Sequence, residues 1–159
     1  MCSTTRTRVI RWNIHCSENG HAAIIYVLAG DTYGRQLGFT PSSEWAVFDA
    51  WIDPVYDEVA SMVHQLLGRT VGVSDCILSV LGVACDPAPS GCRYDFSGRI
   101  WCPVCGSQNT EYGPDDPTQF TMMSVPQVTH NAWVALTKDE QRARINEALQ
   151  AAGCAGVCP

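Results

Sequence analysis

Four cysteines in a short central stretch constrain this chain more than any other feature. Cys85, Cys92, Cys102 and Cys105 fall within twenty-one residues, and the last two belong to a pentad, Cys-Pro-Val-Cys-Gly, that ends at Gly106. Two residues between thiols allow both sulfurs to meet at one tetrahedral metal centre, and a glycine after the second thiol permits a tight turn. The pentad therefore predicts a pair of metal ligands.

This segment resembles the knuckle of zinc-ribbon and rubredoxin-like modules, and the resemblance is limited to residues 85–106. It implies one metal ion held by Cys85, Cys92, Cys102 and Cys105. Four thiolates close the coordination shell, so we expect a structural Zn²⁺, although rubredoxin-type iron would also accept four thiolates. The alternative is a disulfide between Cys85 and Cys92, because the wide spacing of that pair does not require a shared metal.

Residues 9–29 predict an N-terminal β-hairpin. Residues 9–16 alternate between apolar and polar side chains, and residues 22–29 are almost wholly apolar. The dipeptide Asn19-Gly20 favours a two-residue turn between them, which would place Glu18 opposite His21. His15, Cys16 and His21 at the tip of this hairpin also suggest a metal site, but we interpret Glu18 and His21 as a surface charge pair.

Cys16 ends the first strand of this predicted hairpin. A cysteine on the apolar face of a strand is usually a small buried residue, and we favour that role here. Cys16 is also the alternative metal ligand, in place of Cys85 or Cys92.

Residues 41–67 are predicted to be helical in two parts. Pro41 would begin the first part, which carries several aromatic residues, and Asp53 would cap the second part, which ends at Gly68. Residues 74–81 favour a further short helix over a buried strand.

The second half of the chain predicts a small hairpin, a long loop and closing helices. The hairpin covers residues 93–101, and the proline-rich loop covers residues 107–128. A helix is expected over residues 130–136, and a capping box from Thr137 to Glu140 begins the next one.

These elements together predict an α+β fold. It would consist of an N-terminal β-hairpin or small antiparallel sheet packed with helices, a zinc-ribbon-like four-cysteine insertion and C-terminal helices. Residues 1–84 would form the first part of the core, residues 85–112 the zinc-ribbon-like module, and residues 113–159 the loop and helices that complete a single domain.

Charge and cysteine content limit the partners and the compartment. The net charge is −6 and the ten basic residues are scattered, which argues against a nucleic-acid partner because phosphate binding needs clustered Lys and Arg. We expect no membrane span, because no run of eighteen apolar residues is present. The sequence lacks an apolar signal-peptide core, so we expect a cytoplasmic protein in which the nine cysteines serve as metal ligands and free thiols more than as disulfides. Cys154 and Cys158 lie in a small-residue tail that we expect to fray, and the alternative is that this pair completes a second metal site or is modified.

An acidic stretch without Lys or Arg separates Arg35 from Arg69. A solvated helix face is the default explanation, and a docking surface for a basic protein partner is the alternative. The acidic residues concerned are Glu44, Asp49, Asp53, Asp57 and Glu58.

The sequence contains no catalytic or nucleotide-binding motif, so it favours a non-enzymatic binding or adaptor role over an enzyme. A bacterial or phage accessory factor with a structural four-cysteine zinc site would fit this description. The first alternative is an enzyme whose site is assembled from distant residues, with His15, His21, Asp31, His64 and His130 as candidates. The second is a sequence-specific nucleic-acid reader that uses the zinc module.

Overall fold

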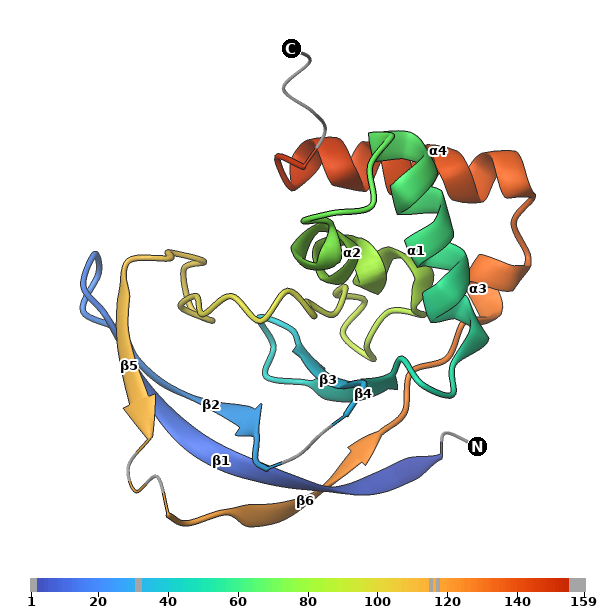
Figure 1. Cartoon of the computed structure of the whole chain (residues 1–159). Helices are drawn as coiled ribbons and strands as arrows, with labels where there is room; N and C mark the ends of the chain where they lie inside the picture. The colour runs from blue at the N-terminus through green and yellow to red at the C-terminus, as the bar shows by residue number, and fades with distance from the viewer. Residues whose placement is uncertain (1–2, 31–32, 115, 117, 155–159) are drawn as a thin grey trace.

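The computed structural model describes residues 3–30, 33–114, 116 and 118–154. Helices gather on one side of the molecule and the long strands lie on the other, with a short two-stranded ribbon between them (Figure 1). The strands are β1 (Thr4–Cys16), β2 (Ala22–Leu28), β3 (Arg35–Phe39), β4 (Trp45–Asp49), β5 (Thr110–Pro114) and β6 (Thr121–Pro126). The helices are α1 (Pro54–Leu67), α2 (Ser74–Val80), the 3₁₀ helix η1 (Leu81–Ala84), α3 (Asn131–Val134) and α4 (Lys138–Ala151). The predicted α+β class is confirmed.

Strand β1 organises the larger sheet because it pairs with three other strands. β2 runs antiparallel along one edge of β1, over the segment from Val9 to His15. The other edge is shared, since β6 pairs with the first half of β1 and β5 with the second half. The end of β1 is thereby held between β2 and β5.

The predicted hairpin is confirmed, but its register is wrong by two residues. Ile14 lies opposite Ala23, whereas a two-residue turn would have placed it opposite Ile25. The loop contains four residues, because Cys16 pairs with His21 and the amide of Gly20 donates to the carbonyl oxygen of Cys16 at 2.8 Å. A shift of two residues keeps every side chain on its expected face, since side chains alternate with a period of two.

The first half of the helix predicted over residues 41–67 is wrong, because this segment belongs to the β3–β4 ribbon. Trp45, Val47 and Phe48 are aromatic or β-branched, and such residues fit a pleated, half-buried surface better than a helix. Gly38 of β3 supports this packing, because a Cβ atom there would approach the Phe96 ring to 2.6 Å.

The second half of that prediction is confirmed by α1. The Asp53 side chain accepts a hydrogen bond from the amide of Val55 at 3.0 Å, and Gly68 ends the helix with a φ of 63°. Val55, Val59 and Val63 recur every four residues and turn inward. They pack into a core that also contains buried residues of α2, η1 and α4.

Helix α2 and the capping box of α4 are also confirmed. The Thr137 hydroxyl accepts from the amide of Glu140, whose carboxylate in turn accepts from the amide of Thr137. Helix α3 begins under a cap from a distant segment: the Asp86 carboxylate accepts hydrogen bonds from the amides of Asn131 and Ala132.

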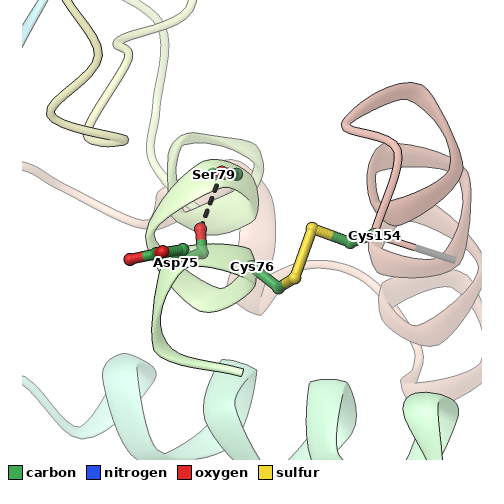
Figure 2. The surroundings of a disulfide bond; sticks show 4 residues. All are labelled: Asp75, Cys76, Ser79 and Cys154. Atoms are coloured by element: carbon green, nitrogen blue, oxygen red, sulfur yellow. Dashed lines mark hydrogen bonds between the residues drawn. A yellow bond between two sulfur atoms is a disulfide. The ribbon is translucent and has the colours of Figure 1, made fainter. Parts of the chain in front are cut away.

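A disulfide joins Cys76 of α2 to Cys154, just beyond the end of α4 (Figure 2). The expectation of a free thiol in a frayed tail is therefore wrong for Cys154. Cys158 lies outside the described residues. The bond connects positions 78 residues apart and ties the last helix to the helical core.

Two predictions for the central region are wrong. Residues 93–101 form no regular hairpin, although Asp95 makes an isolated bridge to Phe39. Residues 107–128 are not all loop, since they contain β5 and β6. Pro114 and Pro126 are the last residues of these strands, where a missing amide disturbs pairing least.

Candidate metal centre

Four side chains from separate parts of the chain meet at one end of the larger sheet. The potential ligand atoms of Cys16, His21, Cys102 and Cys105 all lie within 4.8 Å of one another. Cysteine sulfur and imidazole nitrogen are the ligands that zinc prefers in structural sites. This group has the composition of a Cys₃His metal centre.

The β1–β2 hairpin supplies two of the four ligands. Cys16 is the last residue of β1, and its amide donates to the carbonyl oxygen of His21 at 2.8 Å. Residues paired in this way point their side chains to the same face of a sheet. Gly20 completes the loop with a φ of 70°, a left-handed conformation that glycine adopts without strain.

The tight turn predicted at Cys102 and Cys105 supplies the other two ligands. The amide of Gly106 donates to the carbonyl oxygen of Cys102 at 2.7 Å, and the amide of Cys102 donates to the carbonyl oxygen of Ser107 at 2.8 Å. Gly106 has a φ of 75°, which explains the glycine after the second thiol.

Sheet pairing brings this turn to the hairpin. The chain leaves the turn and enters β5, where Thr110 pairs with Cys16. The amide of Ser17 also donates to the carbonyl oxygen of Asn109 at 2.9 Å. The register between β1 and β5 therefore sets the distance between the two halves of the site.

An aromatic contact anchors the other side of the turn. The Trp101 ring stacks on Phe39 with centroids 4.5 Å apart, and its indole nitrogen donates to the Asp95 carboxylate at 2.6 Å. Phe39, Ile14 and Ile25 form the centre of a small core between the larger sheet and the ribbon. Cys102 is thus preceded by a residue whose position is fixed by packing and by a hydrogen bond.

Two of the six distances between the ligand atoms have the values expected of a tetrahedral zinc centre. A zinc–sulfur bond of about 2.3 Å and a zinc–nitrogen bond of about 2.05 Å give tetrahedral edges of about 3.8 Å between two sulfurs and about 3.6 Å between sulfur and nitrogen. The Sγ atoms of Cys16 and Cys105 are 3.7 Å apart, and the Sγ of Cys102 is 3.6 Å from Nδ1 of His21. The spacing of these side chains therefore leaves room for one zinc ion bound to all four.

Exposure differs strongly among the four ligands. Cys16 and Cys102 are 0% exposed, His21 is half-buried and Cys105 is exposed. The side-chain amide of Asn19 lies 3.4 Å from the Cys105 sulfur and donates to it. Three thiolates with one neutral imidazole would carry three negative charges, so a divalent cation would offset most of the repulsion between them.

Two of the four sequence-predicted ligands belong to this cluster and two lie outside it. Cys102 and Cys105 are members, whereas Cys85 and Cys92 are not. Cys85 is buried in the helical core, where its thiol donates to the carbonyl oxygen of Leu81 at 3.6 Å. Burial raises the pKa of the Cys85 thiol well above its usual range, and the neighbouring carboxylates raise it further. A thiol in this environment is poorly suited to deprotonation by a metal.

Cys92 is half-buried and is held in a separate turn. Its carbonyl oxygen accepts from the amide of Ala88 at 2.9 Å, and its own amide donates to the Ser90 hydroxyl. Ser90 in turn contacts the carboxylate of Glu44. These hydrogen bonds attach the loop after Cys85 to Glu44, the residue before β4, and involve no member of the metal cluster.

The sequence pattern placed His21 at the hairpin tip beside Cys16, but the expected two-residue turn favoured a surface charge pair over a role as metal ligand. That register paired His21 with Glu18, whereas the four-residue loop pairs it with Cys16. The available signal was the spacing Cys16-Ser-Glu-Asn-Gly-His21, in which a strand end and a strand start carry metal-binding side chains. The alternative prediction, Cys16 as a ligand in place of Cys85 or Cys92, agrees with this cluster.

The other histidines proposed for a distributed active site are not brought together. His130 contacts the carbonyl oxygen of Ala84 at 2.5 Å and the Asp53 carboxylate at 2.8 Å, so it links η1 to the cap of α1. His15 lines a different cavity of about 670 Å³, on the outer face of the sheet beside Glu111. His64 is in the last turn of α1, and Asp31 lies outside the described residues.

Most carboxylates of the acidic stretch have partners within the chain. The Nε of Arg35 lies 3.4 Å from the Asp49 carboxylate. The Glu58 carboxylate contacts Lys138 and accepts a hydrogen bond from the indole of Trp133. Glu44 accepts from Ser90, and Asp53 caps α1. Asp57 is exposed. These contacts give four of the five acids a structural role.

Comparison of the chain with protein-family models, with curated proteins and with solved structures finds no match. Among the described residues, no helix combines the length and the apolar character needed to cross a bilayer.

Proposed function

We propose that Cys16, His21, Cys102 and Cys105 bind one structural Zn²⁺ ion. The observation that carries this proposal is the convergence of four ligand atoms within 4.8 Å of one another, from a hairpin and a turn that are distant in sequence. Four protein ligands fill a tetrahedral shell and leave no position for water or substrate. The metal would therefore hold the fold together without taking part in a reaction.

The ligand set supports zinc over iron. Rubredoxin-type iron is bound by four thiolates, whereas three thiolates with one imidazole are a common zinc set. Hard cations such as Mg²⁺ and Ca²⁺ prefer oxygen ligands, and the cluster contains none.

A structural metal has a physical role in this part of the chain. Residues 85–109 contain no regular strand or helix among their described positions, so they gain few backbone hydrogen bonds from secondary structure. Fixing a residue costs about 1–2 kcal/mol of backbone entropy, and structural zinc contributes on the order of 10 kcal/mol in small modules. Zinc between the hairpin and the turn would offset part of this cost.

Four variants distinguish the proposed ligand set from the set predicted from sequence: two change proposed ligands and two change Cys85 or Cys92. Cys16→Ser and His21→Ala should each lower zinc content well below one equivalent, whereas Cys85→Ser and Cys92→Ser should keep it. Zinc is measured by elemental analysis of protein purified without added metal, and Co²⁺ substitution should give the absorption of a tetrahedral thiolate site. Zinc that survives in both Cys16→Ser and His21→Ala but is lost in Cys85→Ser or Cys92→Ser would overturn the proposed set.

We further propose that this zinc-stapled domain acts by binding another protein. Trp51 and Ile52 are each 74% exposed at the turn before α1, and the exposed Asp57 follows in the first turn of that helix. Ile52 also lines a cavity of about 390 Å³ together with Val134, which is itself exposed. Large apolar side chains exposed beside an acidic helix are typical of a protein-binding surface.

The partner proposal is tested by charge reversal at Asp57, which is exposed and lies in the first turn of α1. Asp57→Lys should weaken capture of a specific protein from the native host, and added salt should have the same effect. Glu147→Lys on the exposed face of α4 is the matched control. If neither Asp57→Lys nor added salt changes the amount of partner captured, the proposal of an acidic docking surface is contradicted.

We also propose a reducing, cytoplasmic location. Five cysteines among the described residues are free thiols, which favours such a compartment, whereas the Cys76–Cys154 disulfide is the observation that opposes it. Cell fractionation of the native host tests this proposal.

A further inference from the structure

We infer that Cys105 is the modification site of this zinc centre: hydrogen peroxide oxidises its sulfur, Cys16 then forms a disulfide with it, and zinc is released. The inference rests on the proposed zinc centre and adds a chemical reactivity to it. It follows from an asymmetry among the ligands. Both other sulfurs of the cluster are fully buried, whereas Cys105 is exposed to solvent.

Exposure decides which sulfur an oxidant meets first. Oxidation of cysteine depends on thiolate character and on access, and a metal-bound sulfur is already deprotonated. Cys16 and Cys102 have thiolate character in the zinc-bound state but no solvent access. Cys105 combines both properties.

The geometry also supplies a partner for the oxidised sulfur. Cys16 is the last residue of β1, and its Sγ lies 3.7 Å from the Sγ of Cys105. A disulfide requires the two sulfurs to approach to about 2.05 Å, a movement of less than 2 Å. A sensor cysteine beside a resolving cysteine is the arrangement that reversible thiol oxidation requires.

The reaction balances in two steps with peroxide as the only oxidant. The Cys105 thiolate attacks one oxygen of H₂O₂, so an S–O bond forms, the O–O bond breaks and hydroxide leaves. The Cys16 thiolate then attacks the Cys105 sulfur, so an S–S bond forms, the S–O bond breaks and a second hydroxide leaves. Two thiolates lose two electrons in total, and peroxide takes up both. Cys102 and His21 remain as the only two protein ligands, too few to retain the ion.

The disulfide would preserve one link that zinc had provided. Cys16 and Cys105 belong to the two halves of the site, so their bond keeps the hairpin attached to the turn after the metal has left. Reduction by a thiol would regenerate both ligands. The centre would therefore alternate between a zinc-bound and a disulfide-bound state.

Asn19 moderates the reactivity of the exposed sulfur. Its side-chain amide donates to Cys105, and a hydrogen bond to a metal-bound thiolate withdraws electron density from it. Removing this donor should make the sulfur more nucleophilic, with zinc still bound by all four ligands.

The test follows zinc release from the full, zinc-loaded chain with a chromogenic chelator after addition of hydrogen peroxide. Wild type should release about one equivalent, and peptide mass mapping should find Cys16 linked to Cys105. Asn19→Ala should release zinc about threefold faster or more, a change typical of one lost hydrogen bond. Cys92→Ser is the matched control, since this half-buried thiol lies outside the cluster, and its release rate should equal that of wild type.

Three results would overturn the inference: zinc that stays bound under peroxide, a disulfide that joins Cys102 to Cys105, or an unchanged rate in Asn19→Ala. Zinc content is measured before peroxide is added, so the two proposals fail separately. A chain without zinc overturns the zinc centre and this reactivity together, whereas a zinc-loaded chain that ignores peroxide overturns the reactivity alone.

Discussion

Cys16 and His21 form a hydrogen-bonded pair across the β1–β2 hairpin, with the Cys16 amide 2.8 Å from the carbonyl oxygen of His21. This pairing places a thiol and an imidazole on one face of a two-stranded ladder. The four-residue loop that permits it ends at Gly20, whose φ is 70°. The geometry of the candidate metal centre therefore depends on the backbone of a loop that contributes no ligand of its own.

Gly20→Ala should weaken zinc binding and destabilise the hairpin. An alanine in a left-handed conformation costs about 1–2 kcal/mol, and no atom lies within 4 Å to add a steric clash. We expect urea denaturation to report a loss of this size and a zinc-competition titration to report weaker binding.

Gly113→Ala is the control for this change. Gly113 lies in β5 and also has open space around it, but its φ is not positive. Equal losses in both variants would show that the conformation of Gly20 has no special role.

Asp86 should make the stability of α3 depend on acid pH. Burial alone would raise its pKa, but hydrogen bonds from Thr129, Asn131 and Ala132 outweigh that effect and lower the pKa to about 2. The pKa in the unfolded chain is about 3.8, so the carboxylate contributes stability above pH 4 and loses it as the pH falls from about 4 to 2. Because Asp86 is partly exposed, we discount the effect for solvent screening and expect about 1 kcal/mol.

This prediction is measured as a difference between wild type and Asp86→Ala, both in chelator so that metal loss does not contribute. The difference in unfolding free energy should be constant between pH 5 and 7 and should shrink at pH 2.5. A difference that stays the same at pH 2.5 would mean that the carboxylate charge does not stabilise the cap.

The Cys76–Cys154 disulfide should stabilise the helical core without affecting the metal. It closes a segment of 78 residues, and cross-links of this kind contribute typically 2–4 kcal/mol. Cys76→Ser should therefore unfold at lower urea concentration and keep the zinc content of wild type.

Wild type treated with a reductant should match Cys76→Ser in stability. Any further loss in Cys76→Ser would come from side-chain packing at a buried position, independently of the bond. Loss of zinc from this variant would contradict the separation between the disulfide and the metal centre.

The sequence predicted the helices that begin or end at recognisable capping residues. Asp53 with Gly68 delimits α1, and the Thr137–Glu140 box begins α4, because capping residues satisfy orphan backbone groups within a few positions. The β3–β4 ribbon has no such markers. Its sequence favours a helix locally, and the strands are stabilised by long-range packing such as that of Gly38 against Phe96.

The candidate site was half predictable for the same reason. The turn that holds Cys102 and Cys105 is determined by five consecutive residues, from Cys102 to Gly106. Cys16 and His21 join them only through the hairpin register and the pairing of β5 with β1, which bring together positions almost ninety residues apart. Cys85 was predicted as a ligand because it is close to Cys102 in sequence, whereas its thiol is buried in the helical core.

Metal removal should loosen the two halves of the site before the rest of the fold. The proposed zinc joins the hairpin loop to the turn at Cys102, and residues 85–109 have no regular secondary structure of their own. The other end of β1 pairs with β6 and does not depend on the metal, and α1 buries its valines in the helical core. Chelation should therefore release amide hydrogen-exchange protection first around residues 16–21 and 99–110, while Thr4–Val9 and α1 stay protected. A metal-free chain that keeps residues 99–110 fully protected would show that Trp101, stacked on Phe39 and bonded to Asp95, holds the turn without zinc.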